Sequence, residues 1–446
     1  MTSALPLLLT SEAMPRPSRG SRLDQVCLYG VLALLLFGPL AFGAVESWSI
    51  LIVQVGAGLL FALWSTGQLA ASELEIVGHP LFGPMMLFAV LVLGQLATGR
   101  TAYRAATFSA ALLYSAYGLL CFLVVQCLRR TSQIHVLGWI LSGYGFAIAM
   151  FALLQGVATN SKLYWLRSLS SDGWIYGPYV NHNHYAGLME MLTPIPLVIS
   201  LIGGVQGRRK ALAVLAAALM ASTIFLSGSR GGMAAFAVQM ALLAAFVLKR
   251  RKNWTATFAL AGFLGTALIL LAWLGGVDLG ERMASIHNGT RMELSGGTRL
   301  TIDRDALKMF AQKPLFGWGL GVFPDVYPQF SSLSTNLQLG AAHNDYLQLL
   351  VEMGALGFAT VLWFVLILFR SALRKLKHCP LHTNAAVTLA SMLGITGILV
   401  HSLVDFNLQI PANAALFYVL CVVATMDLHS GHKPHRASSD SRLIIG

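Results

Sequence analysis

The sequence predicts an all-α polytopic membrane protein with about 12 transmembrane helices and a partly helical cap loop outside the membrane. Of its 446 residues, 56% are hydrophobic and only 11% are charged, whereas soluble domains carry about a quarter charged residues. Many segments reach the roughly 20 apolar residues that cross a bilayer. The expected spans are 26–45, 49–70, 80–98, 106–128, 134–157, 185–204, 210–227, 231–248, 254–274, 346–370, 385–404 and 411–427.

Short basic runs between the spans predict the orientation of the chain. Cytoplasmic loops of membrane proteins carry an excess of Lys and Arg, and this rule places both termini in the cytoplasm. The net charge of +12 therefore reflects topology, and nucleic acid is not an expected partner. The runs are Arg129 and Arg130, Arg208–Lys210, Lys249–Lys252, and Arg374, Lys375 and Lys377.

This orientation divides the chain into five parts. They are a cytoplasmic tail at 1–25, spans one to nine at 26–274, an outer loop at 275–345, spans ten to twelve at 346–427 and a second cytoplasmic tail at 428–446. The start of the chain runs directly into a full-length span, so we expect no cleavable signal peptide. The outward segments hold nearly all of the unusual polar residues.

The outer loop is expected to form an ordered cap that contains one amphipathic helix. Pro314 follows the helix and marks its end. The GWGLG segment at 317–321 comes after a helix rather than a strand, so it predicts a tight turn instead of a nucleotide-binding loop. Charged residues are expected on one face, and the other face carries Leu300, Leu307 and Phe310, flanked by Ile302, Ala306 and Met309.

Three arginines in the outward segments are candidate anion ligands. Arg230, in LSGSRGGM at 226–233, begins a span and is followed by two glycines that leave the backbone unscreened. The N–H groups and positive dipole at a helix start favour phosphate, and a guanidinium adds bidentate donors. An arginine that reaches toward lipid headgroups is the alternative. Arg299 lies in the first turn of the cap helix and Arg304 further along, and either side chain could bind an anion or point to water.

Polar residues also precede the sixth span. The segment GPYVNHNHYAG at 177–187 contains Asn181, His182 and His184. These side chains could hydrogen-bond a polyhydroxylated ligand or contact lipid headgroups. No third ligand lies at a suitable spacing from the histidines, so we expect no metal site here.

A further polar group precedes the tenth span, in AAHNDYLQLLVEMGALGF at 341–358. His343 lies at the membrane interface, where a histidine can accept a proton near neutrality. Asn344 follows it, and Glu352 lies roughly two helical turns deeper, where a carboxylate normally faces the protein interior. A structural role for His343 is the alternative.

The last candidate segment, HSLVDFNLQIPANA at 401–414, joins the two final spans. Its residues His401 and Asp405 lie at the same outer face as His343. The Asp405 carboxylate could orient a histidine base or steady nearby arginines. It could equally serve to pair an otherwise isolated charge.

A transporter is the main rival class, because twelve spans with both termini inside is also a common transporter layout. Ion-coupled carriers place ionisable residues and broken helices near the middle of the membrane. Here the span interiors are nearly free of charged residues, and the polar residues gather on one face. This distribution favours an interfacial enzyme over a transporter or a purely structural subunit.

In this order along the chain, the motifs resemble those of the O-antigen ligase and O-antigen polymerase superfamily. The resemblance covers roughly residues 175–425 and is sharpest at SRGG, GTRLTIDRDALKMFAQKPLFGWGLGVF and HNDYLQLLVEMGALGF, with HSLVDFNLQIPANA as a C-terminal element. It implies inverting glycan transfer from an undecaprenyl-diphosphate carrier to a hydroxyl acceptor, without metal or cofactor. It also implies a periplasmic site at the bacterial inner membrane.

The resemblance also implies roles for particular residues. His343 matches the histidine that activates the acceptor hydroxyl, and Arg230 and Arg299 match arginines that bind the donor diphosphate. Many relatives carry an aromatic residue four positions after the loop arginine, where this chain has Asp303, so Arg304 stays open as the loop arginine. Substrate-binding roles are implied for Asn181, His182, His184, Asn344, Glu352 and Asp405.

Two acceptors remain open within this superfamily. A ligase moves a finished glycan to lipid A-core, whereas a polymerase joins a repeat unit to a second lipid-linked glycan. The compact loop at 275–342 favours the ligase, with the polymerase as the alternative and a flippase for lipid-linked glycans as the alternative of another class. The expected partners are the lipid-linked donor, one of these acceptors and membrane lipids.

Overall fold

The computed structural model describes most of the chain, and the regular elements of the described part are helices. Two isolated bridges are the only extended pairings there. The predicted C-terminal tail, most of the N-terminal tail and the first part of the outer loop lie outside the described residues. The described residues are 22–71, 76–157, 162–168, 175–249, 257–258, 260–273, 296–333, 339–378 and 383–426.

Among the described residues, nine helical segments are long and apolar enough to cross a membrane, and three shorter apolar helices accompany them. This set confirms the all-α polytopic fold. The long segments are α1 (Arg22–Leu40), α2 (Ser47–Ala71), α4 (Arg104–Cys127), α5 (Thr131–Val157), the pair α6 (His182–Leu192) and α7 (Pro194–Ile202), α8 (Gly207–Leu226), α9 (Arg230–Lys249), α13 (Asp345–His378) and α14 (Thr383–His401). The shorter ones are α3 (Phe82–Ala97), Leu260–Trp273 and α15 (Pro411–Thr425).

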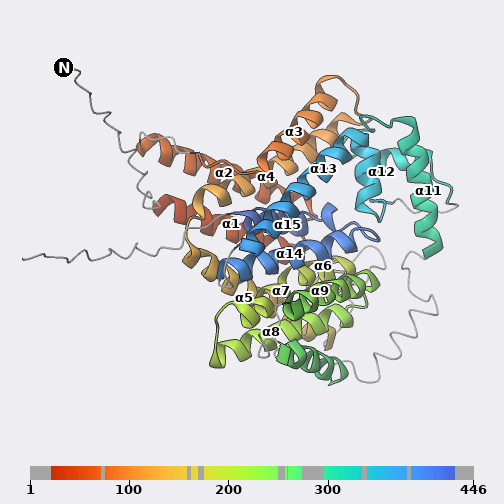
Figure 1. The fold of residues 1–446 in the computed structure, drawn as a ribbon. Helices are drawn as coiled ribbons and strands as arrows, with labels where there is room; N and C mark the ends of the chain where they lie inside the picture. The colour runs from red at the N-terminus through yellow and green to blue at the C-terminus, as the bar shows by residue number, and fades with distance from the viewer. Residues whose placement is uncertain are drawn as a thin grey trace, which may run out of the picture.

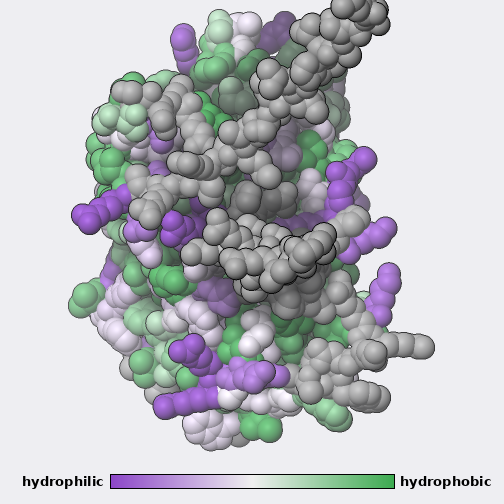
Figure 2. All heavy atoms as spheres, turned by 60° about the vertical axis from the view of Figure 1, so that its left-hand side comes forward, coloured by the Kyte–Doolittle hydropathy of each residue, from purple (hydrophilic) through white to green (hydrophobic). Residues whose placement is uncertain are grey.

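The outer surface of the bundle suits a lipid environment. Large apolar side chains are widely exposed, among them Leu59 at 65% and Leu93 at 61%. Figure 2 shows hydrophobic residues spread over one face, with hydrophilic side chains gathered in separate groups. Lipid tails are as apolar as leucine, so such exposure carries no penalty inside a membrane.

The predicted cap helix is present as α11 (Gly296–Gln312), beside α12 (Phe323–Val326) and the 3₁₀ turn η1 (Tyr327–Gln329). These elements lie together at one end of the bundle, on the right in Figure 1, which we call the cap end. Ile302, Ala306 and Met309 are fully buried, whereas Leu300 and Leu307 are about half exposed. The prediction that Leu300 and Leu307 lead the buried face is therefore wrong.

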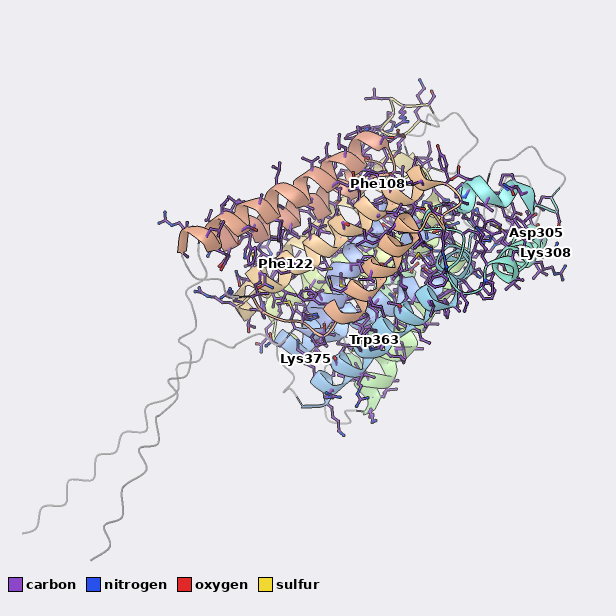
Figure 3. The ribbon with its side chains drawn as sticks, turned by 90° about the horizontal axis from the view of Figure 1, so that it is seen from above. Phe108, Phe122, Asp305, Lys308, Trp363 and Lys375 are labelled. Carbon is purple, nitrogen blue, oxygen red and sulfur yellow. The ribbon has the colours of Figure 1, made fainter. Side chains whose placement is uncertain are left out.

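One charged residue of α11 also departs from the predicted pattern. Asp305 is buried, on the face that was expected to be apolar. Its carboxylate accepts hydrogen bonds from the backbone N–H and the hydroxyl of Ser332, both at 2.7 Å, and pairs with Lys308 at 2.9 Å. Figure 3 shows Asp305 and Lys308 side by side at the cap end. These contacts stabilise the turn after η1, so burial of the charge is compensated.

The GWGLG segment forms the predicted tight turn, and it packs against α13 where that helix bends. Trp318 donates its backbone N–H to the Val351 carbonyl at 3.0 Å. Gly317 (φ +70°) and Gly354 (φ +63°) lie in the left-handed region. A Cβ on either glycine would come within 2.4 Å of backbone atoms of the other segment, so only glycine permits this contact.

Several helix ends meet at the cap end. The starts of α6, α9, α13 and α15 gather there around the end of α14. For example, Asp345 donates its backbone N–H to the Ser402 carbonyl at 3.0 Å, and the Asn413 amide donates to the His184 carbonyl at 2.9 Å. Among the described basic residues, Arg129 follows the end of α4, Arg208 lies at the start of α8 and Lys375 lies near the end of α13. Figure 3 shows Lys375 away from the cap end.

Candidate functional site

His343 occupies the loop directly before α13 in an uncommon backbone conformation. Its φ of +55° lies in the left-handed region, which side chains other than glycine adopt rarely, although histidine, asparagine and aspartate do so more often than most. Such conformations cost about 1–3 kcal/mol and cluster at functional sites. The His343 side chain is 17% exposed, so it can be reached from outside the protein.

Asp405 lies between two histidines from distant parts of the chain. Its Oδ1 atom is 4.0 Å from His343 Nδ1 and 3.7 Å from His184 Nε2. The ring of Phe406 stands nearly perpendicular to both imidazoles, with ring centres 4.6 Å apart in each case. Asp405 is 1% exposed. The structure therefore brings together three of the residues that the sequence singled out.

Electrostatics at this cluster favour an ionised carboxylate beside a neutral histidine. Burial is the main cause that lowers the pKa of His343 to about 4; Asp405 opposes this effect, while Arg299 and His184 add to it. Burial alone would raise the pKa of Asp405, but the neighbouring histidines outweigh it and hold that pKa below its ordinary value. His343 is thus unprotonated near neutral pH, as a general base must be.

Unsatisfied polar atoms surround the same carboxylate. Within the described part of the chain, His343 Nδ1, His184 Nε2 and Asp405 Oδ2 are buried and have no hydrogen-bond partner. Buried polar groups normally have partners. A cluster of such atoms around one carboxylate indicates a place that receives polar groups of a ligand or water.

Arg299 is the loop arginine that lies close to His343. It is partly buried in the first turn of α11, and its charge acts on both His343 and Asp303. Asp303 hydrogen-bonds Asn344, the residue after His343. Arg304 is exposed. The aspartate that departs from the superfamily pattern therefore connects α11 to the histidine loop, and this geometry favours Arg299 over Arg304.

Arg230 is the first residue of α9 and is exposed at the cap end. The residue before it, Ser229, accepts a hydrogen bond from the backbone N–H of Gly232 at 3.1 Å, which is the geometry of an N-cap. A Cβ on Gly231 would lie 2.6 Å from the His401 ring, and one on Gly232 would lie 2.8 Å from the side chain of Ala186. The two glycines make room for neighbouring helices, and the expectation that they also leave the backbone at the start of α9 open to an anion stays a prediction.

The polar segment before α6 divides into residues with different positions. Asn181 caps α6 by accepting a hydrogen bond from the Asn183 N–H at 2.8 Å. His182 is 3% exposed and turned into the protein. His184 lies beside Asp405. His184 therefore contacts the Asp405 carboxylate directly, while the charge of Asp405 also acts on the buried His182.

Asn344 and Asp345 serve the start of α13. Asn344 accepts hydrogen bonds from the backbone N–H groups of Tyr346 and Leu347, both at 3.2 Å. Asp345 is buried and accepts from the Ser402 hydroxyl at 2.7 Å and the Leu408 N–H at 3.0 Å. Asn344 therefore caps α13, and Asp345 holds the histidine loop against the segment after α14.

Glu352, which the sequence assigned to substrate binding, has contacts that favour a structural role. It is 2% exposed. Its carboxylate accepts hydrogen bonds from the backbone N–H groups of Gly321 at 2.8 Å and Phe323 at 3.2 Å, and from the Gln348 amide at 3.1 Å. The carboxylate anchors the GWGLG turn to α13 and has little capacity left for a ligand.

Replacing Glu352 by alanine is expected to destabilise the protein by about 2–3 kcal/mol, because two buried N–H groups would lose their acceptor. Thermal unfolding in detergent measures this loss. Glu352→Gln keeps one acceptor oxygen and is expected to lose less. A Glu352→Ala protein with unchanged stability but weakened substrate affinity would restore the binding assignment.

Sequence reasoning missed several residues that shape the site. Asn413 donates to the Asn407 side chain at 3.1 Å and accepts from the Tyr179 hydroxyl at 2.8 Å. Glu190 lies 2.8 Å from His401 inside the bundle. A carboxylate within the sixth span was a usable signal for Glu190. Among the described residues, no group of three or more His, Cys, Asp or Glu side chains could hold a metal ion.

The fold and site define a polytopic membrane protein with a histidine, a carboxylate and an arginine gathered at one end of its helix bundle. Residues 215–362 match the family model described as O-antigen ligase. This match confirms the resemblance to the O-antigen ligase and O-antigen polymerase superfamily, whose members are glycosyltransferase-like enzymes. The matched segment includes Arg230, Arg299 and His343. No curated protein matches the chain.

Proposed function

We propose that the protein transfers a glycan from undecaprenyl diphosphate to a hydroxyl group of lipid A-core, as an O-antigen ligase. The observation that carries this proposal is the placement of a neutral, accessible His343 beside both Asp405 and Arg299. A base, its orienting carboxylate and a cation for the leaving group are the parts that such a reaction needs.

His343 acts as the base for the acceptor hydroxyl. Its Nδ1 atom is buried and faces Asp405, so the exposed part of the ring presents Nε2 to the acceptor. The acceptor oxygen attacks the anomeric carbon as Nε2 takes the hydroxyl proton. Asp405 then stabilises the imidazolium that forms, because opposite charges at this distance favour the charged histidine.

Arg299 and Arg230 bind the donor diphosphate. Negative charge grows on the diphosphate as the glycosidic bond breaks, and fixed guanidinium groups stabilise it in a setting of low dielectric. The start of α9 adds backbone N–H groups and the positive end of the helix dipole. Attack opposite the leaving diphosphate gives inversion at the anomeric carbon.

The positions of the basic runs support a periplasmic site. Arg129 follows the end of α4, and Arg208 lies at the start of α8. Lys375 lies at the end of the bundle away from the cap. Cytoplasmic loops carry such excess positive charge. With that end in the cytoplasm, the cap end faces the periplasm of the inner membrane, where lipid-linked glycans are joined.

The activity is expected to persist at unusually low pH, because the pKa of His343 is lowered to about 4. A base with the ordinary pKa of about 6.5 would lose roughly tenfold in its active form between about pH 7.5 and pH 5.5. We expect kcat/KM to change less than about twofold over this range, since it reports the free enzyme. Bound diphosphate raises the pKa of His343, so the acid limb of kcat should lie at higher pH. A tenfold fall in kcat/KM would contradict the lowered pKa.

Reconstitution with two competing acceptors tests the proposal. Purified protein in nanodiscs receives an undecaprenyl-diphosphate-linked glycan together with lipid A-core and a second lipid-linked repeat unit. Transfer to lipid A-core, retained in the presence of a chelator, is the expected result. Transfer to the repeat unit would identify a polymerase, and transfer to neither would contradict the enzyme assignment.

A further inference from the structure

We propose that Glu190, His401 and Ser229 form a positioning unit that holds Arg230 in place for the donor diphosphate. The three residues are almost completely buried, at 0%, 1% and 0% exposure. Glu190 Oε1 lies 2.8 Å from His401 Nδ1, and His401 Nε2 lies 3.4 Å from the Ser229 hydroxyl. Ser229 directly precedes Arg230. This inference rests on the proposed function, because it assigns Arg230 to the diphosphate.

We assign the hydrogen bonds of this unit one direction, which ends on the first turn of α9. The Gly232 N–H already donates to the Ser229 oxygen, so the hydroxyl hydrogen of Ser229 is available for His401 Nε2. The Nδ1–H group of His401 then donates to the Glu190 carboxylate. Ser229 thus caps α9 and also bonds His401, so this chain of contacts fixes the orientation of the N-cap.

Capping alone does not account for the carboxylate and the histidine. A serine N-cap stabilises a helix without further support, whereas ionisable groups within a span are costly and usually functional. Here they join three helices, since Glu190 lies on α6, His401 ends α14 and Ser229 precedes α9. A Cβ on Gly231 would collide with His401, which shows how closely α9 approaches the histidine.

Two of these helices also carry or adjoin residues of the cluster around Asp405. His184 lies in the first turn of α6, and Asp405 follows the end of α14 by four residues. The unit therefore sets where Arg230 lies relative to Asp405 and its neighbour His343. A displacement of about 1 Å between catalytic groups can cost roughly 100-fold in rate. Holding Arg230 at a fixed distance from Asp405 and His343 therefore preserves the transfer rate.

The first test measures binding of farnesyl diphosphate to the full-length protein in nanodiscs. His401→Ala and Ser229→Ala are each expected to raise its dissociation constant about 10- to 100-fold. Ser222→Ala is the matched control, because this buried serine of α8 bonds only to carbonyls of Ala218 and Ala267 among the described residues. Unchanged binding in both site variants, or equal weakening in the control, would overturn the proposal.

Two further comparisons separate positioning from general destabilisation. Glu190→Gln keeps an oxygen that accepts from His401 Nδ1, so it should recover most of the binding that Glu190→Ala loses; equal losses would overturn the proposal. In an Arg230→Ala background, His401→Ala should cause no further loss, because its effect passes through Arg230. An undiminished loss there would contradict a positioning role.

The binding readout also separates this inference from the proposed function. A wild-type protein that binds farnesyl diphosphate but transfers no glycan would contradict the transferase, while the double-mutant comparison still decides the role of His401. Where transfer is measured, the variants should raise the KM for the donor and leave the KM for the acceptor unchanged. A rise confined to the acceptor KM would overturn the positioning of Arg230.

Discussion

Replacing His343 by alanine is expected to lower kcat for glycan transfer by about 10²- to 10⁴-fold, the usual contribution of a positioned general base. The imidazole is the group that can take the acceptor proton, and Asp405 cannot replace it because that carboxylate is 1% exposed. Binding of the lipid diphosphate donor should change little, because the arginines remain. Initial rates at saturating donor and acceptor measure the loss.

A second variant separates catalysis from folding at this position. Glycine accepts the left-handed conformation of residue 343 (φ +55°) without strain. His343→Gly should therefore lose transfer as severely as His343→Ala while unfolding at the same or a higher temperature. Near wild-type transfer by either variant would remove His343 as the base.

Replacing Arg299 by alanine is expected to lower kcat/KM for the donor by about 10²- to 10³-fold, as loss of one preorganised charge-stabilising donor does. Arg304→Ala is the matched control on the same helix. Arg304 is exposed, whereas Arg299 is partly buried near His343. Steady-state transfer with varied donor concentration compares the two variants.

The same pair of variants also decides which arginine serves the diphosphate. Loss of activity with Arg304→Ala and retention with Arg299→Ala would reverse the assignment. Arg299→Lys is expected to recover part of the activity, because lysine keeps the charge but not the two parallel donors of a guanidinium. Complete recovery by lysine would show that charge alone is sufficient.

Hydropathy was sufficient to predict the all-α polytopic fold, whereas the orientation drawn from charge stays a prediction. Apolar segments of about 20 residues have few alternatives to spanning helices, so the all-α fold and the approximate spans follow from composition. The cap helix was also predictable as an element. Its buried face was not, because Leu300 and Ile302 are equally apolar and only contact with α12 and α13 selects Ile302.

The site was predictable where a motif lies at a helix end, and not where it depends on contacts between distant segments. His343 and Arg230 attract notice as polar residues beside apolar spans. The 2.8 Å contact between Glu190 and His401 joins residues more than 200 positions apart, and no local pattern indicates it. Glu352 is a carboxylate within an apolar span, as a catalytic carboxylate could also be. Its partners, however, include backbone N–H groups of the cap.

The most direct test of the central claim is to measure released undecaprenyl diphosphate and new glycan product together in proteoliposomes that contain the wild-type protein. A transferase breaks the bond between glycan and carrier, so it should release one undecaprenyl diphosphate for each glycan joined to an acceptor hydroxyl. A transporter would move the intact lipid-linked glycan across the bilayer. Equal amounts of both products are the predicted result. Translocation of the donor with no released diphosphate would contradict the proposed function.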